Sequence, residues 1–347
     1  MNIKQALNQL AEGQSLSRDE MRAVMTEVMT GAATPAQIGA LLMALRIRGE
    51  TIDEIVGAAE VMRSLVTRVQ VSQERLVDLV GTGGDGANLF NVSTAATFVV
   101  AAAGGRVAKH GNRSVSSSSG SSDVLETLGA PLDLSPDHIA KSIETVGLGF
   151  MFAPAHHGAM KHAVGPRKDL GMRTLFNILG PLTNPAYVER QVLGVFSPDL
   201  CQSIAESLSK LGTKHALVVS SADGLDEISI AAPTAVWEMR DGVVERFQID
   251  PNDYGHGHKD LTGLGVNSAQ ESAELIKLAL SLMSGEVAER ARSMIALNAG
   301  AAIYVSGVAA TLKAGIAAAD EAIGSGAALD KLDTFVSFTQ QLRAEAS

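Results

Sequence analysis

The sequence has little cysteine and a deficit of positive charge. Cys201 is the only cysteine in 347 residues, which excludes a disulfide within the chain and fits a reducing compartment. Lysine and arginine number 28 against 38 acidic residues, a net charge of −10. That balance argues against a surface for nucleic acid or other polyanions, although a local phosphate site stays possible.

Long apolar runs are also missing. Residues 1–5 lack the apolar core of a signal peptide, and the alanine-rich stretches are interrupted well before the ~20 residues of a membrane span. We therefore expect a cytoplasmic protein without a membrane partner. The chain is nevertheless 46% hydrophobic, enough for a sizeable core in one large domain or two unequal ones.

The first 70 residues are predicted to be entirely helical. Three sites have the pattern of a capping box, in which a hydroxyl accepts from an early helix amide while a later side chain reaches back. They are Ser17 with Glu20, Thr34 with Gln37, and Thr51 with Glu54. Apolar residues recur at helical spacing within these segments. Helices this short cannot bury such faces alone, so we expect a bundle.

From residue 75 onward, short apolar strands alternate with helices, which indicates a mainly parallel sheet flanked by helices. Strands are predicted at 76–80, 106–108, 148–152, 191–195 and 215–220, and helices at 93–103, 122–128, 136–146, 174–179 and 200–211. The predicted fold class is α/β, with a small N-terminal α-helical bundle domain and a larger α/β domain containing a mainly parallel central sheet.

A glycine-rich segment at 81–88 follows the first predicted strand. Glycines let backbone amides approach a ligand, and a nearby helix start adds positive potential, so the segment suits phosphate. It also matches the G-x-G-x-x-G dinucleotide pattern, but that interpretation needs an acid about 20 positions further on. Here the acid, Asp85, lies inside the loop, so the dinucleotide interpretation is set aside. A glycine turn without a ligand remains the alternative.

Two further segments are candidates for phosphate. Asn91-Val92-Ser93-Thr94 opens the next helix, where Ser and Thr usually act as caps but can also bind phosphate or magnesium. Residues 109–123 begin with Lys109 and continue as a serine-rich stretch. Composition alone suggests a linker. Its position between a strand and a helix favours an oxyanion cradle, with Lys109 and Arg113 beside small hydroxyl residues.

Acids and an arginine complete the candidate set. Asp226 and Glu227 follow the strand at 215–220, where ligands of parallel α/β sheets bind; their oxygens suit magnesium, and a solvated turn is the alternative. Arg167 is predicted in a turn just before a helix, where it would either recognise a carboxylate or face solvent. His156, His157 and His162 lack the i, i+4 spacing of a metal pair, so we predict packing roles for them.

Five blocks resemble the anthranilate phosphoribosyltransferase family in content and order. They are residues 81–86, 91–94, 109–113 with the serine tail, 171–182 and 223–227. The resemblance covers nearly the whole chain. It implies transfer of the phosphoribosyl group from phosphoribosyl pyrophosphate to the amine of anthranilate, with Mg²⁺ as cofactor and pyrophosphate as the second product.

The resemblance also implies roles for individual residues. Phosphoribosyl pyrophosphate is expected at Gly81, Gly84, Asp85, Asn91, Ser93, Thr94, Lys109, Ser117 and Ser121. Anthranilate is expected at Gly81, Asn112 and Arg167, and magnesium at Ser93, Asp226 and Glu227. No catalytic base is expected. Leu89 and Ser114 depart from the family pattern, and Leu89 is expected to remove one contact to the diphosphate.

The family further implies how the chain is divided. A helical domain of residues 1–70, with a returning segment at about 168–190, would form a homodimer, and residues 71–167 and 191–347 would form the phosphoribosyl pyrophosphate-binding domain. Two relatives of the same fold are the alternatives. A pyrimidine nucleoside phosphorylase has less need of paired metal acids, and a nucleic-acid-binding protein needs a basic face that the negative charge disfavours.

Overall fold

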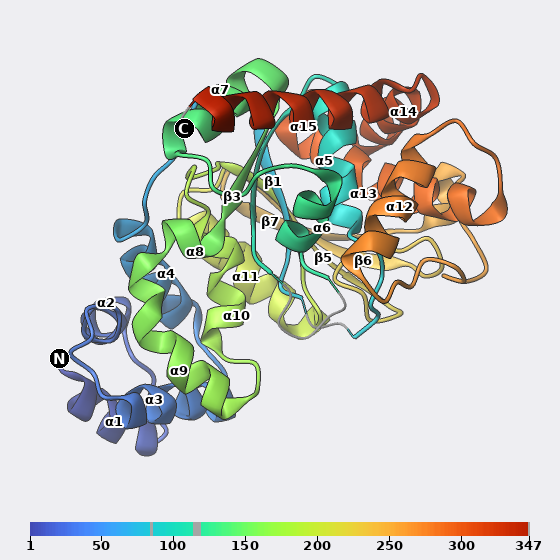
Figure 1. Ribbon diagram of the computed structural model, residues 1–347. Coiled ribbons are helices and arrows are strands. Elements are labelled where there is room, and N and C mark those ends of the chain that lie inside the picture. Colours follow the sequence, from blue (N-terminus) through green and yellow to red (C-terminus); the bar gives the residue numbers. More distant parts are fainter. Residues whose placement is uncertain (84–85, 114–118, 346–347) are drawn as a thin grey trace.

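The computed structural model describes residues 1–83, 86–113 and 119–345. Figure 1 shows a small lobe of helices that carries the N-terminus and a larger lobe built around a sheet. The fold class predicted from the sequence is confirmed. Within the described part of the chain, none of the helices has both the length and the apolar character needed to cross a membrane.

Four helices open the chain: α1 (Ile3–Ala11), α2 (Arg18–Met29), α3 (Pro35–Arg48) and α4 (Ile52–Ser64). All three predicted capping boxes form, at the starts of α2, α3 and α4. A fourth, from Asn2 and Gln5, caps α1 and was not predicted. Each box satisfies amides that a helix start leaves without partners, so local sequence fixes where these helices begin.

A later segment of the chain packs against these helices. It comprises α9 (Lys161–Leu170) and α10 (Leu175–Leu179), and Ala163, Leu175 and Phe176 share one apolar core with α1 to α4. Arg167 lies inside α9, so its predicted place in a turn before a helix was wrong. Gly165-Pro166 suggested a break, but the helix continues past Pro166 to Gly171 because tertiary packing overrides local propensity.

The larger lobe contains a seven-stranded sheet in the order β3-β2-β1-β4-β5-β6-β7. The parallel strands are β1 (Leu76–Gly81), β2 (Arg106–Gly111), β3 (Leu148–Phe152), β4 (Arg190–Gly194) and β5 (His215–Ser221). An antiparallel hairpin of β6 (Thr234–Arg240) and β7 (Val243–Ile249) extends one edge. The five parallel strands lie where the sequence predicted them, with ends shifted by at most three residues.

Helices cover both faces of this sheet. They are α5 (Val92–Ala102), α6 (Ser121–Leu128), α7 (Pro136–Val146), α11 (Cys201–Lys210), α12 (Ala269–Leu280), α13 (Glu286–Ser306), α14 (Leu312–Gly324) and α15 (Ala327–Glu345); a short turn of helix, α8 (Ala153–His156), follows β3. The largest apolar core joins α5 and α12 to α15 with one face of the sheet. On the other face, α11 and parts of β4, β5 and β6 share the core of the helical lobe.

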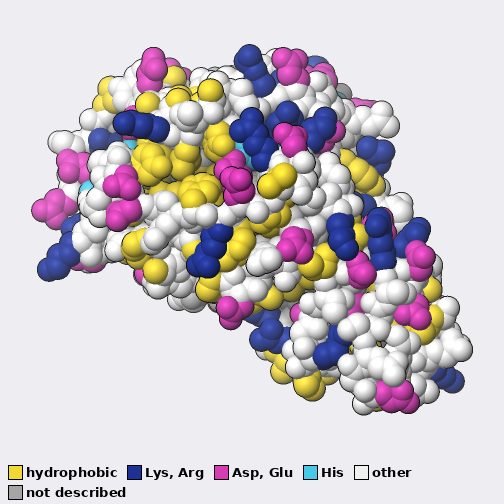
Figure 2. Space-filling view, turned by 180° about the vertical axis from the view of Figure 1, so that it is seen from behind, with side chains coloured by type: hydrophobic (Ala, Val, Ile, Leu, Met, Phe, Trp, Pro, Cys, Tyr) yellow, Lys and Arg dark blue, Asp and Glu magenta, His cyan; other side chains and the backbone are white. Residues whose placement is uncertain are grey.

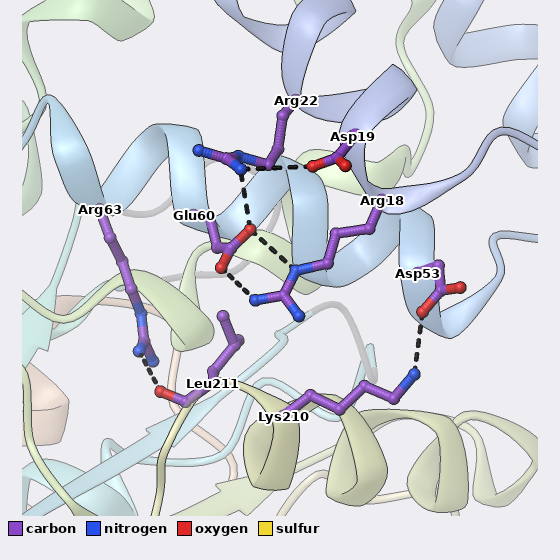
Figure 3. Close-up of polar contacts among 8 residues, drawn as sticks. All are labelled: Arg18, Asp19, Arg22, Asp53, Glu60, Arg63, Lys210 and Leu211. Carbon is purple, nitrogen blue, oxygen red and sulfur yellow. Dashed lines mark hydrogen bonds and ion pairs between the residues drawn. The ribbon is translucent and has the colours of Figure 1, made fainter.

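Polar contacts join α4 to two later segments of the chain (Figure 3). The half-buried Arg63 guanidinium donates to Leu182 O at 2.7 Å and to Leu211 O at 3.0 Å, the contact that Figure 3 draws. Lys210 of α11 pairs with Asp53 of α4 at 2.8 Å, on the exposed side of the same contact. Glu60 pairs with arginines of α2 instead. Backbone carbonyls from two distant segments therefore hold one helix of the small lobe.

Candidate active site

A cavity of about 690 Å³ lies between the two lobes. Its walls come from the carboxyl ends of β1 and β2 and the loop after β5 on one side, and from α9 and α10 on the other. Nine of the predicted site residues line it: Gly81, Asn91, Ser93, Lys109, Asn112, Ser121, Arg167, Asp226 and Glu227. Gly84, Asp85 and Ser117 lie outside the described residues, as does Ser114.

The strand order explains why these residues meet. β1 lies between β2 and β4, so the chain winds in opposite directions on the two sides of β1. Open α/β sheets form a crevice at such a reversal, outside the carboxyl ends of the strands. The glycine segment leaves β1 at this point, and the acidic pair follows β5, two strands away.

Two glycines make room for Asp226. Gly81 and Gly194 are register partners at the ends of β1 and β4. A Cβ on Gly81 would lie 2.4 Å from Asp226 Oδ2, and one on Gly194 would lie 1.6 Å from Asp226 O. Gly83 N also donates to Asp226 Oδ2 at 2.6 Å. The strand ends thus place this carboxylate against the glycine segment, a packing reason that the sequence pattern did not reveal.

The start of α5 is built differently from a simple cap. Asn91 occupies the N-cap position, yet its side chain makes no capping hydrogen bond. Ser93 N donates instead to Glu227 Oε1 at 3.2 Å. An acid from the β5 loop therefore takes the place that Ser or Thr was expected to fill, and the positive end of the helix faces the cavity.

Thr94 does not line the cavity. Its side chain is fully buried, and its Oγ1 has no hydrogen-bond partner among the described residues. The predicted direct contact of Thr94 with a ligand therefore finds no support in the position of this side chain.

Lys109 is a buried cation that reaches the cavity from within β2 rather than from the loop after it. Its Nζ donates to Leu79 O at 2.7 Å and to Ser93 Oγ at 3.2 Å. Burial lowers the pKa of this amine, while the carboxylates of Asp78 and Glu227 act to raise it. The ammonium is thus fixed in place next to the start of α5.

Asp226, Glu227 and Ser93 are chemically suited to magnesium. They offer two carboxylates and a hydroxyl on one cavity wall. Magnesium commonly binds one or two carboxylates and fills its shell with water and phosphate oxygens. Among the described residues, no cluster of three or more His, Cys, Asp or Glu side chains forms a closed metal cage, so the acidic pair suits an ion shared with a phosphate ligand.

The serine-rich segment returns to the site at its end. Ser119 Oγ donates to Asn91 Oδ1 at 2.7 Å, and Ser121 begins α6 at the cavity wall. Arg113, expected beside the oxyanion cradle, pairs with Asp123 and Glu126. Much of its charge is therefore already balanced by acids of α6.

The opposite wall presents two arginines. Arg167 stacks on the ring of Phe176 at 5.3 Å, and burial lowers its pKa. No carboxylate pairs with Arg167 among the residues that the structure describes. Arg173, which the sequence did not single out, stacks on Phe196 at 3.6 Å across the two lobes. This wall is suited to an anionic group on a flat ligand.

Two histidines also reach the cavity. The rings of His110 and His157 lie 5.0 Å apart, and burial lowers the pKa of both, that of His157 to about 4. The Nε2 atoms of both lack a partner among the described residues. His156, by contrast, bonds Thr67 O at 2.7 Å through Nδ1. The packing role predicted for the histidines thus fits His156 better than His157, and no spacing pattern in the sequence distinguishes the two.

Leu89 belongs partly to the core. It lines the cavity, packs against the largest apolar cluster and forms an isolated bridge with Gly265. Its expected effect, the loss of one polar contact to a diphosphate, stays a prediction.

Comparison with known proteins agrees with this geometry. Residues 73–329 match the α/β domain of the glycosyl transferase family, and residues 4–66 match the helical bundle domain of that family. An anthranilate phosphoribosyltransferase from Teredinibacter turnerae is 61% identical over 98% of this chain and 99% of its own length. The structure of the Thermus thermophilus enzyme of the same name superposes with a TM-score of 0.89 at 40% identity, covering 96% and 99% of the two chains.

A second solved structure is that of the Saccharomyces cerevisiae enzyme in complex with PRPP and Mg. It has a TM-score of 0.87 and 28% identity and covers 98% of each chain. Matches of this extent include both lobes and every described wall of the cavity. The chain therefore belongs to the glycosyl transferase family and, within it, to the anthranilate phosphoribosyltransferases.

Proposed function

We propose that this protein transfers the phosphoribosyl group of phosphoribosyl pyrophosphate to the amine of anthranilate, giving N-(5-phosphoribosyl)anthranilate and pyrophosphate. One observation carries the proposal: a single cavity has a buried lysine, a helix start and an acid pair on one wall and Arg167 on the other. The yeast relative has been solved with PRPP and Mg and, separately, with 4-fluoroanthranilate, ligands that suit these two walls.

The α/β lobe is proposed to hold the sugar donor. Amides at the start of α5 and in the glycine segment offer donors for phosphate oxygens, and Lys109 adds a fixed positive charge. Gly81, Gly84, Asp85, Asn91, Ser93, Thr94, Ser117 and Ser121 complete the proposed donor site. For Thr94 a direct contact would need its buried hydroxyl to turn toward the ligand, so we expect its part to be small.

Ser93, Asp226 and Glu227 are proposed to hold magnesium with the donor. Bound there, the ion would neutralise charge that builds on the departing pyrophosphate. Gly83 N and Ser93 N now donate to the two acids. The same two amides can donate to phosphate oxygens once the acids face a cation, so the acid pair and the donor share one set of partners.

The helical side is proposed to orient anthranilate, with contributions from Gly81 and Asn112. Arg167 would meet the carboxylate with its planar guanidinium. The neutral imidazoles of His110 and His157, which line the same cavity, would add polar contacts without repelling the amine. The amine has a free lone pair and becomes acidic only as its bond to the sugar forms. The chain therefore needs to supply orientation and charge stabilisation rather than a strong base.

The alternatives fit less well. A nucleoside phosphorylase that attacks with free phosphate has little use for the acid pair that lines this cavity. A nucleic-acid-binding relative needs a basic face, whereas Figure 2 shows acidic and basic side chains interspersed over the face that it draws.

We further propose that the returning segment of about residues 168–190, together with the earlier part of α9, belongs with residues 1–70 as one discontinuous domain. The apolar core shared by Leu175, Phe176 and Leu182 with α1 to α4 supports this division, whereas Ala186 and Val188 pack with strands of the sheet. A homodimer through this lobe is supported by the exposed apolar side chain of Ile47 on α3, which is 78% exposed. The cytoplasmic location stays a prediction from composition.

The decisive experiment follows the loss of anthranilate fluorescence on incubation with phosphoribosyl pyrophosphate and magnesium. We expect a loss that needs both the donor and the metal and that falls by at least about 1,000-fold in Asp226→Asn/Glu227→Gln, because two groups that act on the leaving charge are removed. Folded protein that consumes no anthranilate under these conditions would overturn the proposal.

A further inference from the structure

Asn91 behaves unlike an ordinary helix cap. An asparagine at this position normally accepts a hydrogen bond from the second or third amide of its helix. In α5 it does not. Its Oδ1 accepts instead from Ser272 Oγ at 2.8 Å and from Ser119 Oγ at 2.7 Å, and its Nδ2 donates to Ser119 O at 3.3 Å.

Ser272 holds Asn91 at two points. Its hydroxyl donates to Asn91 Oδ1 and accepts from Asn91 N at 3.0 Å, which uses its single proton and one of its two lone pairs. Ser272 is fully buried on α12, 181 residues away along the chain, and is not among the residues that line the cavity. Since α12 packs against α6 and belongs to the largest core, the hydroxyl is held rigidly.

We propose that Ser272 is a positioning residue for the sugar donor: by holding the Asn91 side chain away from the amides of α5, it keeps the start of this helix open to donor phosphate. The inference rests on the proposed function. It assigns to α12, which contributes no residue to the cavity wall, control over one of the three candidate phosphate-binding segments, the start of α5.

The relative strengths of the hydrogen bonds support this role. A capping bond and a neutral hydrogen bond between side chains stabilise a folded protein by similar amounts. Two hydroxyls on Oδ1 therefore outweigh the capping alternative, whereas one hydroxyl only matches it. Without Ser272, Asn91 would spend much of its time capping α5, where its oxygen takes an amide that phosphate needs.

The hydrogen-bonded cluster of Asn91, Ser119 and Ser272 links α5 to the serine-rich segment, because Ser119 of that segment provides the second hydroxyl that donates to Asn91 Oδ1. Two of the three phosphate candidates of the α/β lobe, residues 91–94 and 109–123, are thus tied to Asn91. Arg167 lies on α9 in the other lobe, where its guanidinium stacks on Phe176, whereas Asn91, Ser119 and Ser272 bond one another. A change at Ser272 should therefore weaken binding of the sugar donor and leave binding of anthranilate unchanged, whereas a general loss of structure would weaken both.

The test compares Ser272→Ala with wild type and with Ser268→Ala. Ser268 caps the same helix through Glu271 N at 3.1 Å. Its carbonyl accepts from Ser272 N at 3.1 Å, a contact that alanine keeps, so the loss of its hydroxyl weakens α12 without removing a hydrogen bond from Asn91. Calorimetry would measure binding of phosphoribosyl pyrophosphate with magnesium, and steady-state rates would give both Michaelis constants. We expect Ser272→Ala to weaken donor binding five- to tenfold, with the Michaelis constant for anthranilate within twofold of wild type and Ser268→Ala unchanged in both.

A double variant sharpens the result. Ser119→Ala and Ser272→Ala remove hydroxyls from the same oxygen, so their effects on donor binding should not add. Donor binding within twofold of wild type in Ser272→Ala overturns the inference. So does an equal loss in Ser268→Ala, or a parallel rise in both Michaelis constants.

The outcomes also separate the two proposals. If wild type binds the donor and Ser272→Ala binds it less well, but neither forms product from anthranilate, the inference about the donor site stands and the proposed reaction falls. If wild type does not bind the donor at all, both fall.

Discussion

The two walls of the cavity are built by opposite means. On the α/β side, Lys109, Asp226 and Glu227 are each held by hydrogen bonds to backbone or side-chain atoms of neighbouring strands and helices. On the helical side, Arg167 and Arg173 are held by aromatic rings. A ring fixes the plane of a guanidinium but leaves its donors available, whereas the hydrogen bonds of the α/β side fix both position and direction.

This difference indicates a division of tasks. The α/β wall is ready to receive a charged group whose position must be fixed for bond breaking. The helical wall offers guanidinium groups whose hydrogen-bond donors are still available, which suits recognition of a small acceptor. Substitutions on the two walls should therefore change different kinetic constants.

Among single substitutions, the largest effect is expected at Lys109. Lys109→Met should lower kcat/KM about 100-fold, because the charge facing the leaving pyrophosphate is lost. Michaelis constants for anthranilate should change little. Lys141→Met, at an exposed ion pair with Glu345, is the matched control. A loss of less than about fivefold in Lys109→Met would contradict the electrostatic role.

Arg167 should affect the other substrate. Arg167→Ala is expected to raise the Michaelis constant for anthranilate about 30-fold and to leave that for the donor within twofold. Arg167→Lys keeps the charge without the planar fork, so its Michaelis constant for anthranilate should lie between those of wild type and Arg167→Ala. Lys168→Ala, at the exposed neighbouring position, should match wild type. Equal rises for both substrates would remove the distinction between the walls.

His157 lines the cavity, and substituting it should change how the free energy of unfolding depends on pH. Its pKa is lowered to about 4 from a usual value of 6.5 by burial, so the unfolded chain takes up its proton first as pH falls. The free energy of unfolding should therefore drop between pH 7.5 and pH 5, by about 2 kcal/mol from this group. Urea titrations at both pH values should show a drop smaller by about that amount in His157→Asn. An unchanged drop would indicate that His157 is not the group responsible.

The smallest effect is expected outside the cavity. Lys210 and Asp53 form an ion pair between the lobes, but both side chains are about half exposed. Lys210→Ala should cost at most about 0.5 kcal/mol and leave both Michaelis constants unchanged. A clear change in either constant would show that this contact controls how the lobes meet.

Local sequence predicted part of this molecule well. The capping boxes of α2 to α4 depend on residues three apart, and the parallel strands depend on short apolar runs, so both can be recognised without tertiary information. The hairpin of β6 and β7 also had a signal, Asp241-Gly242, with both residues at positive φ, a common two-residue hairpin turn. The hairpin was nevertheless not predicted from the sequence.

Other features depend on contacts that the sequence does not display. Asn91 looks like a cap, and only Ser272, 181 residues away, diverts it. Arg167 follows Gly165-Pro166, and only packing of α9 shows that it lies on a helix. Gly81 looks like a ligand-binding glycine, while the structure shows that it also makes room for Asp226. The sequence could identify the residues of the site but not the partners that position them.

The core of the helical lobe has a consequence for how the protein is made. Helices α1 to α4 are synthesised first, yet Arg63 finds its acceptors only at Leu182 and Leu211, and the apolar faces of these helices are covered by α9, α10 and α11. An emerging chain of 70 residues would expose those faces to other nascent chains. The lobe at the N-terminus can therefore be completed only after more than 200 residues have left the ribosome.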